Sequence, residues 1–286
     1  MSNRILFNSL KHIAITHKQK LMATFSLVAI ENILLLIYPL IAGFAVNAVM
    51  QGKTWQALSY AFLVLIIWLI GSARRVLDTR AFVRIYADLV VPVIVNQRTQ
   101  HSTSTVVARA NLSRQFVEFF EQHLPMIITS VFSIVGSVVM LLWIEFWSGV
   151  VVLAILLGFI AILPSYVAKN DKLYFKLNNR LEKEVGVIER TSHNELTKHY
   201  DLISRLKIAI SNREAVSFLA VGVAMAILFG TTLTLLTVKG YGSAGHIYAV
   251  ITYLWTFAIS LDDMPNLIEK YSELKDIGGR VDVEKS

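Results

Sequence analysis

Long runs of apolar residues dominate the chain. Six of these runs are long enough to cross about 30 Å of hydrocarbon as helices, which takes about 20 residues each. They cover approximately residues 21–50, 55–73, 124–144, 150–168, 215–238 and 247–261. All are far longer than the stretches of about 10 alternating residues that form membrane β-strands. The pattern therefore predicts an all-α membrane protein with six transmembrane helices.

Two polar connections between these runs keep a helical repeat. Within residues 169–214 apolar side chains recur in two series, Leu173, Leu177, Leu181 and Ile188, then Leu196, Tyr200, Ile203 and Ile210. Ser192 and Glu195 fit a capping box, so a new helix is expected to start between the two series. Each arm of about 20 residues would extend about 30 Å beyond the membrane. The connection before the third run follows the same plan, and residues 104–125 are expected to form one helix that is solvated first and lipid-facing later.

Composition and charge narrow the class of protein. The 286 residues are 55% hydrophobic and 16% charged, well below the roughly 25% charged residues of soluble domains. The net charge of +7 is interleaved with the apolar runs, which argues against a nucleic-acid-binding face. The chain has no cysteine, which excludes disulfides, thiolate catalysis and cysteine-ligated metals. Residues 1–20 are polar and amphipathic, and no signal-peptidase site follows them, so an uncleaved first span is expected.

The distribution of basic residues predicts the orientation. Of the lysines and arginines, 25 lie before the first run, after the last run or in the two long connections, and only Lys53 and Lys239 lie in the short connections. By the positive-inside rule, both termini and both long connections are cytoplasmic. We expect an integral protein of a bacterial plasma (inner) membrane.

The pattern resembles the six-helix transmembrane domain of ATP-binding cassette (ABC) exporters. Two stretches carry the likeness beyond topology: STVVARANLSRQFVEFFEQHLPMII from residue 104, and YPLIAGFAVNAVMQGK from residue 38. The resemblance implies an amphipathic elbow over residues 1–20, a transmembrane domain over 21–280 and a tail over 281–286. It also implies a dimer with a second copy or a related chain, which encloses a 12-helix pathway, and a partner nucleotide-binding subunit that carries ATP and Mg²⁺.

The chain itself shows no ATPase motif. NAVMQGKT at residues 47–54 contains the GKT of a P-loop but follows a membrane span rather than a strand. SLDD at 260–263 sits at a span end, and IGGR at 277–280 lacks the family signature. Gly278 and Gly279 are expected to end the last helix. We therefore expect no cofactor bound by this chain and no intrinsic enzymatic activity.

Several polar and aromatic residues within the spans are candidates for a substrate cavity: Glu31, Asn32, Arg75, Asp78, Tyr253 and Trp255. An acid at the centre of a span costs about 3 kcal/mol, so Glu31 should face away from lipid. It either lines a cavity, where it could couple transport to protons, or makes a hydrogen bond between helices. Arg75 and Asp78, one turn apart, can form an ion pair, and near the inner membrane surface the arginines are expected to contact lipid phosphates, or else to line a cavity for an anionic cargo. Tyr253 and Trp255 could stack on a hydrophobic substrate or simply pack.

The two long connections hold the residues that the resemblance places against the ATPase partner. These are Arg109, Asn111 and Arg114 in the first connection, and Glu195, His199, Tyr200 and Asp201 in the second. Any solvated helical hairpin would show a similar mixture of charges. His193 and His199 lie six residues apart on a helix and point to different sides, so no metal site is expected.

The sequence thus favours the transmembrane subunit of an ABC-type exporter, driven by ATP hydrolysis in a separate subunit. The alternative is an ATP-independent carrier, which Glu31 could link to protons, or a membrane scaffold with the same fold. A fragment of a longer transporter is a third reading.

Overall fold

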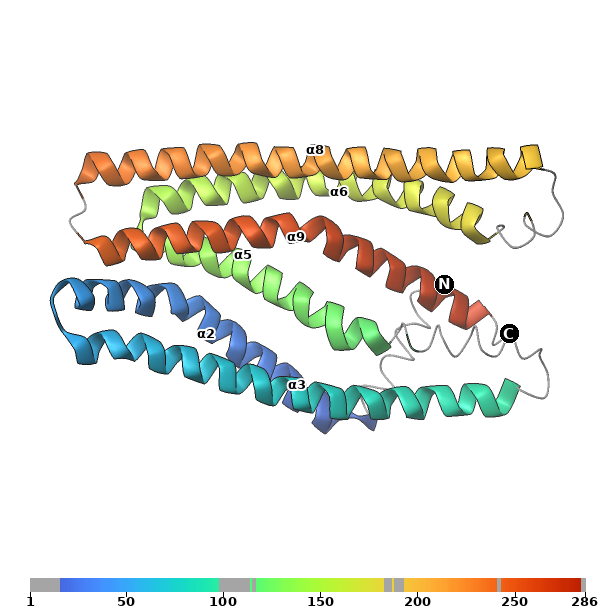
Figure 1. Ribbon diagram of the computed structural model, residues 1–286, viewed down its shortest axis with the longest axis horizontal. Helices are drawn as coiled ribbons and strands as arrows, with labels where there is room; N and C mark the ends of the chain where they lie inside the picture. The colour runs from blue at the N-terminus through green and yellow to red at the C-terminus, as the bar shows by residue number, and fades with distance from the viewer. Residues whose placement is uncertain are drawn as a thin grey trace. The chain divides into compact units, whose positions relative to one another are not determined.

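The computed structural model of the chain consists of helices. It describes residues 16–97, 114, 117–182, 187, 193–240 and 243–283, and these residues contain no strand. The helices are α2 (Lys18–Met50), α3 (Thr54–Gln97), the π-helix η1 (Phe119–His123), α5 (Leu124–Ile144), α6 (Phe146–Glu182), α8 (His193–Lys239) and α9 (Ala244–Val283) (Figure 1). Six stretches of these helices are long and apolar enough to cross a membrane, which confirms the predicted fold class.

Several helices are much longer than a membrane is thick. The 44 residues of α3 span about 66 Å and the 47 residues of α8 about 70 Å, against about 30 Å of hydrocarbon. In both helices the polar stretch continues the apolar one without a break. The predicted arms are therefore rigid extensions of the spans rather than separate segments. The predicted helix start at Ser192 lies outside the described residues, and Glu195 lies in the first described turn of α8.

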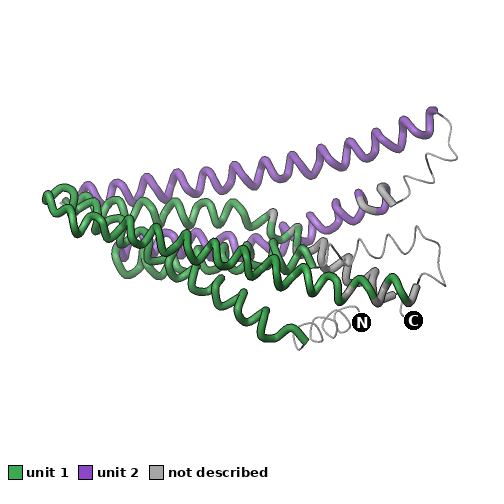
Figure 2. Tube along the Cα trace, turned by 60° about the horizontal axis from the view of Figure 1, so that its bottom comes forward, with its two compact units in different colours: residues 1–144, 239–286 green, residues 145–238 purple. Residues whose placement is uncertain are grey.

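The chain divides into two compact units (Figure 2). Residues 1–144 and 239–286 form one unit, in which α2 packs against α3, α5 and α9, and α5 also packs against α9. Residues 145–238 form the other unit, which contains α6 and α8. In this second unit the arms are joined by a cluster of buried side chains from both helices, Leu177, Ile203 and Ile210. The Arg213 guanidinium also donates to the Tyr166 carbonyl and lies 4.4 Å from the centre of the Tyr166 ring.

The first unit is held together at one end by a close contact between α2 and α9. A Cβ on Gly43 would lie 2.3 Å from the Gly245 carbonyl oxygen, so the two backbones touch. The Asn47 Oδ1 accepts hydrogen bonds from the Gly245 N–H at 2.8 Å and from the Ser243 hydroxyl at 2.9 Å. Asn47 therefore satisfies a backbone donor in the first turn of α9, which has no partner within its own helix.

A proline in α2, one turn before Gly43, changes the hydrogen bonding of this helix. Pro39 lies inside the helix, where its ring removes one backbone donor and disturbs the carbonyls of the preceding turn. The Tyr253 hydroxyl of α9 donates to one of those carbonyls, that of Leu36, at 2.6 Å. Such side-chain donors are a common way to satisfy backbone groups beside a proline in a membrane helix.

Two helix boundaries differ from the expectation. The helix α9 continues to Val283, through Gly278 and Gly279, so the prediction that this pair ends the helix is wrong. Glycine in a helix costs only about 1 kcal/mol, which does not suffice to end the helix.

The helix leading into α5 contains the π-turn η1, which the sequence pattern did not reveal. Pro125 follows directly and cannot donate to the carbonyl of Glu121, and the wider turn accommodates this loss. The first part of the helix predicted over residues 104–125, namely residues 104–113, lies outside the described residues.

Candidate functional site

A charged cluster joins α2 and α3 within the first unit. The Arg74 Nε lies 3.1 Å from the Glu31 Oε2 and 3.9 Å from the Asp78 Oδ2. The side chains of Arg74, Glu31 and Asp78 are 23%, 19% and 12% exposed, so all three are mostly shielded but reachable. One guanidinium therefore bridges a carboxylate on the neighbouring helix and one on its own helix.

The turn between α2 and α3 sets the depth of this cluster. Gly52, at φ +70°, supplies the left-handed residue that lets the chain reverse between Met50 and Thr54. Glu31 lies about 28 Å from Met50 along α2, and Arg74 about 30 Å from Thr54 along α3. With the turn at one border of a hydrocarbon layer about 30 Å thick, these lengths place the cluster near the opposite border. Glu31 is therefore a border acid and not a centred one, which lowers the cost of placing it there.

Local sequence makes room for the charged groups. Gly71 precedes Arg74 by one turn, and a Cβ on Gly71 would lie 3.5 Å from the Glu31 Oε1. A side chain larger than alanine at this position would displace the carboxylate. Gly71, Arg74 and Asp78 are three and four residues apart, so they lie on one face of α3. This face offers α2 free space at the glycine, a positive charge and a negative charge.

Two more polar groups complete the cluster. The Glu121 carboxylate in the π-turn η1 lies close enough to Asp78 for the two charges to repel each other. The Thr24 side chain of α2 is completely buried beside Asp78. Among the described residues, the Asp78 Oδ1 completes no hydrogen bond. Arg74 thus bridges two carboxylates, Glu31 and Asp78, and a third carboxylate, Glu121, lies near Asp78.

The structure brings together only some of the predicted cavity residues. Glu31 and Asp78 lie in the cluster, but the partner of Asp78 is Arg74 rather than the predicted Arg75, because Arg75 lies on an exposed face of α3. Asn32, next to Glu31, is 2% exposed and its amide donates to the carbonyl of Val28 in its own helix at 2.8 Å. Its side chain is thus occupied in part by its own backbone.

The two aromatic candidates in α9 have different surroundings. Tyr253 is completely buried and donates to the Leu36 carbonyl, which makes it part of the packing between α9 and α2. Trp255 is 57% exposed. A second group of tyrosines was not anticipated: the Tyr38 and Tyr60 hydroxyls lie 2.5 Å apart, and the hydroxyl of Tyr248 lies beside them. These three rings come from α2, α3 and α9.

The residues predicted to contact an ATPase partner are partly described. Arg109 and Asn111 lie outside the described residues, whereas Arg114 is helical and exposed. Glu195, Tyr200 and Asp201 are exposed in the first turns of α8, where Asp201 pairs with Arg205 at 2.9 Å. His199 differs, since it is 5% exposed with its ring against that of Tyr200 at 5.6 Å. A partner could reach the exposed three directly, but not His199.

The cluster combines acidic side chains with a guanidinium and a hydroxyl group. In the described part of the chain, no group of three histidine, aspartate or glutamate side chains is placed to hold a metal ion. The arrangement can neutralise a cation, exchange a proton or lock α2 to α3. Sequence reasoning did not assign Arg74, Thr24 or Glu121 to the site. The available signal was helical spacing, because Thr24 and Glu31 are seven residues apart on α2, as are Gly71 and Asp78 on α3.

Comparison with known proteins identifies the family to which this chain belongs. No curated protein matches the chain. The sequence model of the family described as the ABC transporter transmembrane region matches residues 10–245, which includes α2 to α8 and the cluster at the membrane border. The protein is therefore an integral membrane subunit of a transporter and belongs to the ABC transporter transmembrane region family.

Proposed function

We propose that the chain is the transmembrane subunit of an ABC-type exporter. It forms half of a translocation pathway, together with a second copy or a related six-helix chain. ATP hydrolysis in a separate nucleotide-binding subunit drives the change between inward-facing and outward-facing states. The observation that carries this proposal is the continuity of α3 and α8, which run from the spans far beyond the hydrocarbon as single helices. Such rods can transmit a movement from a docked motor to the membrane.

The exposed ends of these rods are the proposed docking surface. Glu195, Tyr200 and Asp201 lie exposed at the start of α8, and Arg114 is exposed in the other connection. With Arg109 and Asn111, they would form the contact with the nucleotide-binding subunit, which carries ATP and Mg²⁺. The 25 basic residues on the arm and terminus side support a cytoplasmic position for these surfaces in a bacterial inner membrane.

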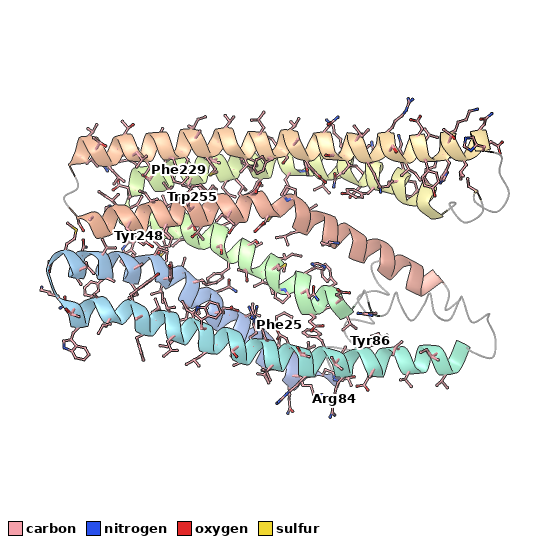
Figure 3. The ribbon with its side chains drawn as sticks, viewed as in Figure 1. Phe25, Arg84, Tyr86, Phe229, Tyr248 and Trp255 are labelled. Atoms are coloured by element: carbon pink, nitrogen blue, oxygen red, sulfur yellow. The ribbon has the colours of Figure 1, made fainter. Side chains whose placement is uncertain are left out.

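Co-expression with the cognate ATPase tests the proposal. The complex in lipid nanodiscs should hydrolyse ATP in a vanadate-sensitive manner, and Arg109→Glu should depress turnover by a factor between about 2 and 30, the usual range for a change in coupling. Arg84→Glu makes the same charge change at an exposed position on α3, 25 residues before Arg109 in the same connection, and should leave turnover unchanged (Figure 3). Equal turnover in Arg109→Glu and the unmodified complex would refute coupling through this surface.

A nucleotide-independent carrier is the second candidate, and the charged cluster is the observation that favours it. Such a carrier would move its solute in vesicles that contain no nucleotide, in response to a proton gradient, and Glu31→Gln would abolish that movement. The exporter proposal expects no transport in the absence of ATP. The same vesicles, with and without the ATPase and ATP, separate the two candidates.

A further inference from the structure

The side of α3 that faces away from α2 is exposed and apolar over one membrane thickness. Residues 54–73 contain no charged side chain, and they form about 30 Å of helix, which equals the thickness of the hydrocarbon. Leu65 and Val76 lie about 160 to 180° around the helix from Arg74, which contacts α2. Both are exposed, at 55% and 46%, as is Leu69 between them at 61%. This side of α3 is therefore open to the acyl chains of lipid.

Two arginines flank this surface where it leaves the hydrocarbon. Four exposed residues at intervals of three or four form what we call the α3 strip: Ser72, Val76, Thr79 and Val83. Arg75 and Arg80 are exposed and lie about 70° around the helix from the strip, one on each side. Neither arginine pairs with a carboxylate in the part of the chain that the structure describes. Their positive charges therefore face the surroundings of the helix.

The depth of the two arginines matches the layer of lipid phosphates. Along α3, Arg75 lies about 32 Å and Arg80 about 39 Å from Thr54. The hydrocarbon is about 30 Å thick, and the headgroups add about 5 to 8 Å on each side. Helical side chains lean toward the N-terminus of their helix, so Arg80 leans back toward the membrane, while the long side chain of Arg75 can extend the other way. Both guanidinium groups can thus reach one level.

From this geometry we infer that the α3 strip binds an anionic phospholipid, with its phosphate between Arg75 and Arg80 and an acyl chain along Leu69. Guanidinium groups bind phosphate through paired hydrogen bonds, and the exposed Ser72 hydroxyl can donate a further one. A zwitterionic lipid fits less well, because the two arginines repel its ammonium group. Binding needs neither nucleotide nor a motor. Only the assignment to the cytoplasmic leaflet rests on the proposed orientation.

Native mass spectrometry of the purified chain in detergent tests the site. The chain is titrated with phosphatidylglycerol and phosphatidylcholine of identical acyl chains, and with soluble glycerophosphoglycerol, which is the anionic headgroup without chains. The first phosphatidylglycerol should bind about 25-fold more tightly than phosphatidylcholine, since each basic residue near the surface contributes about fivefold. The soluble headgroup should not displace it, because it leaves the apolar strip uncovered. Equal affinity for the two lipids, or displacement by the soluble headgroup, overturns the inference.

Variants of exposed arginines locate the site on α3. Arg75→Gln and Arg80→Gln should each weaken phosphatidylglycerol binding about fivefold and leave phosphatidylcholine binding unchanged, whereas Arg80→Lys keeps the charge and should retain most of the affinity. Arg84→Gln is the matched control, because Arg84 lies about 6 Å further from the membrane, below the phosphates. Unchanged lipid affinity in Arg80→Gln contradicts the inference, and loss of the nucleotide-binding subunit in that variant would assign the surface to a protein partner instead. Lipid binding without any ATP-driven transport would refute the proposed function alone.

Discussion

At the scale of single residues, the glycine contact between α2 and α9 makes the sharpest prediction. A Cβ on Gly245 would lie 1.9 Å from the Gly43 carbonyl oxygen and 2.6 Å from the Asn47 side-chain nitrogen. The obstructing atom is backbone and cannot rotate away. Gly245→Ala should therefore separate the helices and destabilise the protein by about 3 kcal/mol, at the upper end of the usual cost of overpacking. Thermal unfolding of the purified protein in detergent measures the effect.

A matched glycine on another helix serves as the control. Gly222, inside α8, has nothing within 4 Å of its missing Cβ. Gly222→Ala should leave the midpoint of unfolding unchanged or raise it slightly, because alanine is the better helix former. Equal midpoints for the two variants would show that the contact at Gly43 and Gly245 is not as close as the structure has it.

The sequence-based predictions were least complete for the partners of single side chains. Glu31 and Asp78 were singled out because acids in apolar surroundings stand out in the sequence. Arg74 was not identified as their partner, because the register between α2 and α3 decides whether Arg74 or Arg75 contacts Glu31. A change of one residue turns a helical side chain by about 100°, and the linear pattern does not fix that angle across two helices. The tyrosine group of Tyr38, Tyr60 and Tyr248 was missed for the same reason.

At the scale of elements, the packing of the two arms of the second unit can be tested. Ile203 on α8 is 5% exposed in the cluster with Leu177 and Ile210, whereas Ile208, on the same helix, is 58% exposed. Ile203→Asp buries a charge among apolar side chains and should loosen the arms. We expect faster amide hydrogen exchange in residues 170–182 and 193–213 of this variant. Ile208→Asp should exchange like the unmodified protein, and equal exchange in both variants would show that the cluster does not hold the arms together.

The elements themselves were largely predictable from the sequence. Long apolar runs fix the six spans because a membrane leaves an exposed backbone no alternative to a helix. The arms were predictable from the repeat at Leu173, Leu177 and Ile203. Two features were not. The π-turn before Pro125 depends on how the helix accommodates a missing donor, and the continuation of α9 through Gly278 and Gly279 shows that a favourable stop signal does not force a helix to end.

At the scale of the whole molecule, the account predicts which side of the membrane each connection faces. The chain has no cysteine, so single-cysteine variants can be read without background. Lys53→Cys lies in the exposed turn between α2 and α3, and Glu195→Cys in the exposed start of α8. A membrane-impermeant maleimide should label the first in intact cells and the second only after permeabilisation, as the excess of basic residues on the arm side requires. The reverse labelling pattern would contradict the proposed orientation.

The whole-molecule account depends most on the claim that the exposed ends of the arms contact a nucleotide-binding subunit. A photo-reactive amino acid in place of Tyr200, which is 41% exposed near the start of α8, tests that claim in the native membrane. Mass spectrometry of the adduct should identify a protein with ATP-binding motifs, and the same probe in place of Trp68, exposed in the span of α3, should yield no such adduct. Adducts at Tyr200 without a nucleotide-binding protein would contradict the account.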